Sequence, residues 1–245
     1  MNALVPLGRR AAAEAVGTAG LVAVVVGSGI QATELSRDVG TQLLANCLAT
    51  VFGLGVLIAV FGPVSGAHFN PVVTLAAWIT GRRSGEGMSL RDVAVYVPAQ
   101  IAGAIAGSVL ANAMFGLPAV TFSGHDRSAS HLWLGEVVAT AGLLLVVLGL
   151  ARAGRASLAP AVVAAFIGAA YWFTSSTSFA NPAVTIGRAF TDSFAGITPA
   201  SVPGFVAAQL VGAAVGLGLT AVVFGPPARA AAGTAVPLAA AVPAR

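Results

Sequence analysis

Long apolar segments alternate with short polar connections along most of this chain. Most of the apolar segments approach the roughly 20 residues that a helix needs to cross a bilayer. The first is too long for the apolar part of a signal peptide and contains Glu14, so we interpret it as a helix. The pattern therefore predicts an all-α membrane protein with six spans. They are Ala11–Ala32, Leu43–Phe61, Val93–Phe115, Leu132–Leu150, Ala159–Phe173 and Val206–Phe224.

Composition and charge agree with a membrane protein and indicate its orientation. Of the 245 residues, 57% are hydrophobic and 8% are charged, where a soluble domain carries about 25% charged residues. Arginines gather on one side of the predicted spans, which places both termini in the cytoplasm by the positive-inside rule and the chain in the inner (plasma) membrane. The cytoplasmic arginines are Arg9, Arg10, Arg82, Arg83, Arg91, Arg152, Arg155, Arg229 and Arg245. No basic helix face or aromatic-interleaved patch accompanies them, which argues against a nucleic-acid partner.

Three short patterns recur in the same order in both halves of the chain. Each half holds three spans, an odd number, so the second half enters the membrane from the opposite face. We therefore expect inverted repeats over about 11–115 and 132–224. The matched patterns are Glu14-Ala-Val-Gly-Thr18 with Glu136-Val-Val-Ala-Thr140, Asn70-Pro-Val-Val-Thr74 with Asn181-Pro-Ala-Val-Thr185, and Ala99-Gln100 to Gly107 with Ala208-Gln209 to Gly216. The last pair contains the GxxxG spacing that lets helices pack closely in lipid.

Each Asn-Pro pair predicts the start of a short helix. Asn is a favoured N-cap and Pro is favoured at the first helical position, which applies to Asn70-Pro71 and to Asn181-Pro182. The apolar runs that follow end near Ile79 and Phe190, about 15 Å of helix and half of a membrane. Two such half-helices would meet near the midplane, and their positive ends disfavour cations and protons there. If the Asn oxygens cap the helices, both side-chain amide groups stay free to donate to a solute.

These patterns resemble the aquaporin (major intrinsic protein) family over roughly Ala11 to Phe224. The resemblance implies a right-handed bundle of six helices with two re-entrant half-helices, a pore in each protomer, and a homotetramer in the bilayer. It makes residues 1–225 one membrane channel domain, while 226–245, rich in Ala and Pro, are expected to form a flexible tail. Val72 stands where the family usually has Ala, as Ala183 does in the second box. We expect this change to be tolerated, with slight narrowing at the midplane.

The expected outer filter departs from the family pattern. Family members usually carry Arg directly after the second box, where this chain has Val184. By motif position the other filter walls are Phe52, Ala169 and Ser178, and an ungapped count from Asn70 selects Thr50 instead of Phe52. A small Ala169 and an uncharged Val184 predict a wider, more apolar filter, which argues against selectivity for water alone.

Four further polar residues are candidates for roles near the pore. Arg188, one turn beyond Val184, either supplies a displaced positive charge to the outer vestibule or reaches the interface and pairs with Asp192. His68 fits the wall of the cytoplasmic vestibule and has no second metal ligand at suitable spacing. Glu14 and Glu136 either support the backbone before the boxes or relay protons, and their symmetric recurrence favours support.

The expected function is passive passage of small uncharged solutes, without a cofactor or metal. Val184 and the stretch AAYWFTSSTSFANPAVT resemble a bacterial subset encoded with arsenic-resistance genes, which implies arsenite or antimonite hydroxides and methylated arsenicals beside glycerol-like polyols and water. A water-selective aquaporin and an inverted-repeat secondary transporter are the alternatives. No positioned nucleophile accompanies the Ser and Thr residues, so an enzyme is not expected. The single cysteine, Cys47, allows no intrachain disulfide.

Overall fold

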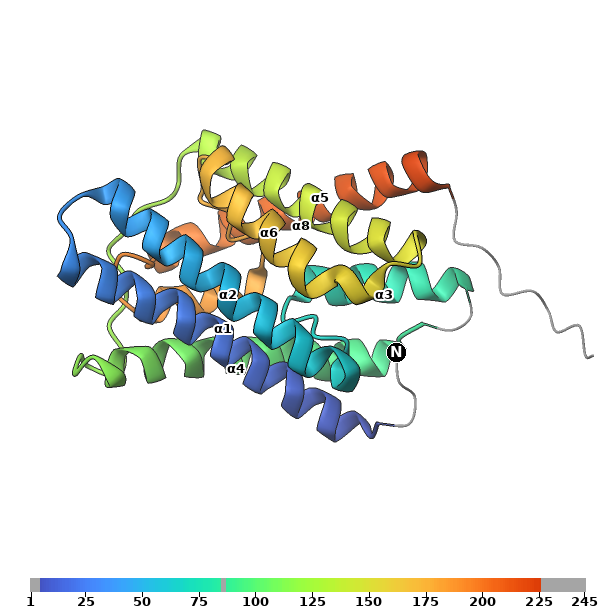
Figure 1. Cartoon of the computed structure of the whole chain (residues 1–245), viewed down its shortest axis with the longest axis horizontal. Coiled ribbons are helices and arrows are strands. Elements are labelled where there is room, and N and C mark those ends of the chain that lie inside the picture. Colours follow the sequence, from blue (N-terminus) through green and yellow to red (C-terminus); the bar gives the residue numbers. More distant parts are fainter. Residues whose placement is uncertain (1–4, 85–86, 226–245) are drawn as a thin grey trace, which may run out of the picture.

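The computed structural model describes residues 5–84 and 87–225, and these residues form a helical bundle (Figure 1). Within the described residues, six helices are long and apolar enough to cross a membrane, which confirms the predicted spans. The long helices are α1 (Leu7–Leu35), α2 (Val39–Ser65), α4 (Leu90–Met114), α5 (Ser130–Arg152), α6 (Ala159–Phe173) and α8 (Val202–Phe224). The shorter helices are α3 (Pro71–Ser84), α7 (Pro182–Gly187) and the 3₁₀ turns η1 (Ala156–Leu158), η2 (Arg188–Phe190) and η3 (Pro199–Ser201).

Local sequence signals account for several helix ends. Asp38 caps α2 by accepting a hydrogen bond from the Thr41 N–H at 2.7 Å, and Ser89 forms a capping box with Asp92 at the start of α4. Helix α2 ends at Gly66, whose φ of +92° is a conformation that glycine adopts readily. Gly66 thus begins the turn that leads from α2 to the first Asn-Pro box.

The two halves pack by the same rule. Helix α1 packs most extensively on α4, and α5 packs on α8, so each half joins its first span to its third. A Cβ on Gly103 or Gly107 would run into the carbonyl oxygens of Ala15 and Ala19. In the second half, a Cβ on Gly212 would lie 2.6 Å from the carbonyl oxygen of Val137. The GxxxG pairs therefore act as expected, because only glycine permits this backbone approach.

The first half-helix is longer than the sequence predicts, and the second ends where the sequence predicts. Helix α3 has 14 residues, about 21 Å, and continues past Ile79 to Ser84. Helix α7 has only six α-helical residues, and η2 extends it in a tighter coil to Phe190. Each half-helix contacts the third span of the other half, α3 on α8 and α7 on α4, which locks the repeats together.

Both described ends of the chain lie at the same end of the bundle. In Figure 1 the start of α1 and the end of α8 point to one side, as an even number of spans requires. The segment 226–245, expected from its composition to be a flexible tail, lies outside the described residues.

Candidate functional site

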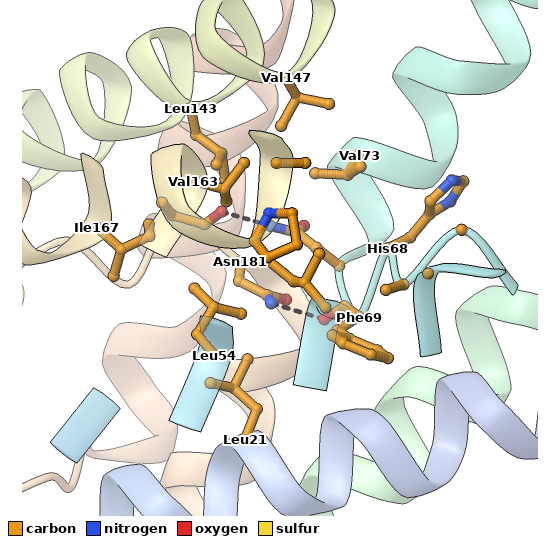
Figure 2. A pocket seen from close by; sticks show the side chains of 18 of the residues that line it. Leu21, Leu54, His68, Phe69, Val73, Leu143, Val147, Val163, Ile167 and Asn181 are labelled. Atoms are coloured by element: carbon orange, nitrogen blue, oxygen red, sulfur yellow. Dashed lines mark hydrogen bonds between the residues drawn. The ribbon is translucent and has the colours of Figure 1, made fainter. Parts of the chain in front are cut away.

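A cavity of about 730 Å³ runs through the interior between the two halves. Ala159 and Tyr171, near opposite ends of α6, both line it. Twelve helical positions separate them, or about 18 Å, so the cavity follows more than half of a bilayer core. Figure 2 shows Val163 and Ile167 of α6 on one side and Val73 and His68 on the other. The walls are mainly aliphatic, as in most small-molecule sites.

The two Asn-Pro boxes meet at this cavity and are hydrogen-bonded to each other. Asn70 Nδ2 donates to the Ala180 carbonyl oxygen at 2.8 Å, and Asn181 Nδ2 donates to the Phe69 carbonyl oxygen at 2.7 Å (Figure 2). Their Oδ1 atoms accept from Val72 N and from Ala183 N, both at 3.0 Å, and so cap α3 and α7. The expectation that both amide groups stay wholly free is therefore wrong. Each amide group donates one hydrogen bond to the backbone of the opposite box.

The backbone before each box adopts the left-handed region. All five described non-glycine residues with positive φ fall in these two stretches, although L-residues other than Asn and Asp rarely adopt this region. They are Ala67, Phe69, Thr177, Ser178 and Ala180. Such strain persists only where the surroundings enforce it and gathers at functional sites.

Two buried carboxylates hold these stretches. Glu14 accepts from His68 N at 3.0 Å and from Phe69 N at 2.7 Å, while Glu136 accepts from Phe179 N and Ala180 N, both at 2.8 Å. These hydrogen bonds satisfy N–H groups that no helix engages, at a depth where water is scarce.

Two glutamines complete the same arrangement in each half. Gln100 Nε2 donates to Glu14 at 2.7 Å, and Gln209 Nε2 donates to Glu136 at 2.6 Å. All four side chains are fully buried. The repeated Glu and Gln patterns in the sequence thus meet across helices as two equivalent networks.

Toward the outer side, the cavity wall differs from the expected filter. Phe52 is wrong as a wall residue, because its side chain is 68% exposed on the outside of α2. Ala169 is also exposed on the outside of α6. The wall contains Thr50 and Tyr171 instead, whose hydroxyl oxygens lie 3.1 Å apart.

The physical reason for both corrections is helix rotation. On a helix, two residues of shift turn a side chain by about 200°. The two-residue shortening assumed before Ser65 therefore selected the outer face of α2, and the count along α6 did the same. Tyr171 fills space that Ala169 was expected to leave open.

Val184, Ser178 and Arg188 do line the cavity. Val184 is 5% exposed and faces it with two methyl groups, and Arg188 is equally buried. Asp192 accepts from Gly124 N at 3.0 Å. A buried Arg188 on the cavity wall is incompatible with reaching the membrane interface to pair with Asp192.

The remaining box residues are packed rather than exposed to the cavity. Val72 and Ala183 are fully buried among apolar neighbours, and neither lines the cavity, so the extra methyl groups of Val72 do not narrow it. Pro71 and Pro182 are buried at the helix starts. His68 lines the cavity and its Nδ1 lies 3.1 Å from Thr74 Oγ1.

Sequence reasoning missed Tyr171 and Phe179 as wall residues. Tyr171 was recognisable by one signal, because a hydroxyl in an apolar span needs a hydrogen-bond partner. Cys47 is buried, with Sγ 3.5 Å from the Gly168 carbonyl oxygen. Within 5–84 and 87–225, no three His, Cys, Asp or Glu side chains gather as a metal site would require.

Six spans, two inverted half-helices and a cavity along their junction define a membrane channel. Comparisons with known proteins identify its family. A family profile described as Major intrinsic protein matches residues 3–179. The aquaglyceroporin AqpS of Rhizobium meliloti is 50% identical over 213 residues, 87% of this chain and 89% of that protein. The probable aquaporin AqpM of Archaeoglobus fulgidus is 30% identical, over 78% of this chain and 86% of that protein.

A solved structure supports the same fold. The X-ray structure of the aquaglyceroporin from Plasmodium falciparum aligns with a TM-score of 0.65, over 87% of this chain and 95% of that one, at 22% identity. The chain therefore belongs to the major intrinsic protein family and has the aquaporin fold. It is a membrane channel and not an enzyme.

Proposed function

We propose that this chain is a passive channel for small uncharged solutes, with glycerol-like polyols and water as its main class. The observation that carries the proposal is Val184, which presents an apolar, uncharged wall where family members usually place Arg. The same cavity also has polar groups in its wall, the hydroxyls of Thr50 and Tyr171. A polyol has carbon–hydrogen and hydroxyl faces, so a wall of both kinds suits it. A relative that is 50% identical is named an aquaglyceroporin, which supports this class.

Trivalent arsenic and antimony hydroxides belong to the same proposal. They are neutral, similar in size to small polyols, and carry several hydroxyl groups, so the features that admit glycerol also suit them. Methylated arsenicals add an apolar group that Val184 would contact. We propose these metalloids as further solutes.

The assembly proposal is a homotetramer with one pore in each protomer. Each chain holds the whole cavity and both boxes, so a pore needs no neighbour. Spans α2 and α6 are among the least buried within one chain. Large apolar side chains on α2 form a ladder at helical spacing, Leu44, Leu48, Phe52, Val56 and Val60. This surface suits either lipid or another protomer.

We also propose that the channel lies in the inner (plasma) membrane with both termini in the cytoplasm. The arginine bias supports this orientation. Residues 1–225 would form the channel domain.

Flux through purified protein in liposomes tests the proposal. Water, glycerol and arsenite are compared for the parent, for Val184→Arg and for Val184→Leu, which keeps the wall apolar. The parent should pass glycerol and arsenite, and Val184→Arg should reduce both by at least about tenfold, as a misfit in a narrow site does, while retaining water. A parent that passes water alone would contradict the proposal and favour the water-selective alternative.

The same liposomes distinguish a channel from a transporter. Channel flux rises linearly with the solute gradient. Saturation, or a response to a proton or sodium gradient, would favour the secondary transporter.

A further inference from the structure

Two guanidinium groups contact one aromatic ring at the outer end of the cavity. Arg188 Cζ lies 3.4 Å from the centroid of the Phe179 ring, and Arg127 Cζ lies 5.1 Å from it. Both distances are within the range of cation–π attraction. Phe179 is itself 4% exposed and packs edge-on against Phe205, with ring centroids 5.1 Å apart. The ring is therefore a fixed support for both charges.

Backbone carbonyl groups fix the orientation of the two side chains. Arg127 Nε donates to the Gly196 carbonyl oxygen at 3.0 Å. Arg188 Nε donates to the carbonyl oxygen of Ala195, the neighbour of Gly196. Arg188 comes from η2 and Arg127 from the connection between α4 and α5. The pair thus joins three segments of the chain: η2, the α4–α5 connection, and the segment that contains Ala195 and Gly196.

No described carboxylate forms an ion pair with either arginine. Asp126, next to Arg127, accepts from Ser128 N at 3.0 Å and from Ser201 Oγ at 2.9 Å. Glu136 is occupied by the backbone N–H groups of the box segment. The positive charge at this end of the cavity is therefore not neutralised by a direct partner.

The two arginines line two different hollows. Arg188 lines the interior cavity, while Arg127 lines a second, shallower hollow of about 400 Å³ together with Gln42, His125 and Asp126. Phe179, which both guanidinium groups contact, itself lines the interior cavity, so both charges lie beside that cavity.

We propose that Arg188 and Arg127 form a displaced cationic filter, one helical turn beyond Val184, that determines specificity in this channel. Arg188 N–H groups that Ala195 leaves free donate to the oxygens of the passing solute, and the paired charge repels protons and cations. The apolar Val184 wall and the cationic wall are then consecutive along the path instead of sharing one level. This inference rests on the proposed passage of uncharged solutes.

Coulomb's law sets the expected size of the effect. One charge about 6 Å away changes the free energy of a cation by an amount that corresponds to roughly threefold in water and roughly a hundredfold at the effective dielectric of a protein surface. We therefore expect removal of Arg188 to raise cation and proton conductance by about tenfold.

The experiment uses the full chain in liposomes and measures proton conductance, water flux and the ratio of glycerol to urea flux. The variants are Arg188→Met, Arg188→Lys, Arg127→Met, and Val184→Arg combined with Arg188→Met. Arg37→Met is the matched control, because Arg37 is exposed in the connection between α1 and α2 and lines neither hollow.

Arg188→Met should raise proton conductance and lower the glycerol-to-urea ratio, and Arg127→Met should do so more weakly. Proton conductance should stay near the parent value in Arg188→Lys and in the control Arg37→Met. It should also stay near that value in the double variant, where Val184→Arg replaces the charge lost in Arg188→Met. Parent-like proton conductance and solute ratio in Arg188→Met and Arg127→Met would overturn the inference. If Arg188→Met fails to assemble, Arg127→Met decides alone.

A different result would contradict the proposed function without deciding the role of the two arginines. A parent without glycerol flux contradicts the solute proposal, while proton conductance relative to water flux still reports on the two arginines.

Discussion

Asn70 and Asn181 each donate a side-chain hydrogen bond to the backbone of the opposite box, Asn70 to Ala180 O at 2.8 Å and Asn181 to Phe69 O at 2.7 Å. Each amide therefore performs two structural tasks, since its oxygen also caps its own half-helix. The pair fixes the positive ends of α3 and α7 at one place in the cavity. The repeated Asn therefore links the two halves of the chain by hydrogen bonds.

Replacement of either Asn by Ala should destabilise the protein to a similar extent. Loss of the cap costs about 1 kcal/mol, and the abandoned carbonyl costs about 1–3 kcal/mol. Asn70→Ser, which can still cap but is too short to cross to Ala180, should lose less. Thermal unfolding in detergent measures this, and a large loss at only one of the two sites would contradict the symmetric link.

Glu14→Gln and Glu136→Gln should both reduce stability by about 2–4 kcal/mol, because an amide group replaces a carboxylate oxygen that accepts buried N–H donors. Glu34→Gln is the control, since Glu34 is exposed on α1. Unfolding by denaturant in mixed micelles compares the three. If these carboxylates mainly relay protons, the two buried variants would instead unfold like the control while altering proton conductance.

A glycine packed between α4 and α1 and an unpacked glycine on α8 should respond to alanine with stability changes of opposite sign. Gly107→Ala should destabilise by about 1–3 kcal/mol, because the new Cβ meets the Ala19 carbonyl oxygen and Val22. Gly218→Ala, with nothing within 4 Å of its Cβ position, should stabilise by about 0.5–1 kcal/mol as alanine normally does in a helix. Unfolding temperature reports both, and equal signs would argue against the tight α1–α4 contact.

The hydroxyl pair of Thr50 and Tyr171 predicts a flux effect. Tyr171→Phe and Thr50→Val should each lower glycerol flux by about fivefold, the equivalent of one ordinary hydrogen bond, with water flux changed less. Phe52→Leu, on the outer face of α2, should leave both fluxes at the parent level. Stopped-flow measurements on liposomes make the comparison. A strong effect of Phe52→Leu with none at Thr50 would restore the original filter assignment.

Some features of this channel followed from the sequence because they depend on local chemistry. Apolar run length predicted the spans, and Asn-Pro predicted both half-helix starts. The recurrence of Glu14 as Glu136 indicated matching buried roles, and the structure places each against the backbone before a box. Such features need only residue type and spacing along the chain.

Side-chain direction across helices was decided by tertiary structure. Phe52 and Thr50 are two positions apart and point to the outside of the bundle and to the cavity respectively, and the same holds for Ala169 and Tyr171. A motif count that errs by two residues reverses the face, since each residue turns the helix by about 100°. The contact of Arg127 and Arg188 on one ring likewise joins segments distant in sequence.

The sequence by itself therefore determined the membrane class, the inverted repeat and the two boxes, because hydrophobic length, capping and repetition act locally. Only the tertiary structure decided which side chains form the pore wall and which charges lie along it. That choice depends on helix rotation and on packing between segments, which residue spacing does not specify.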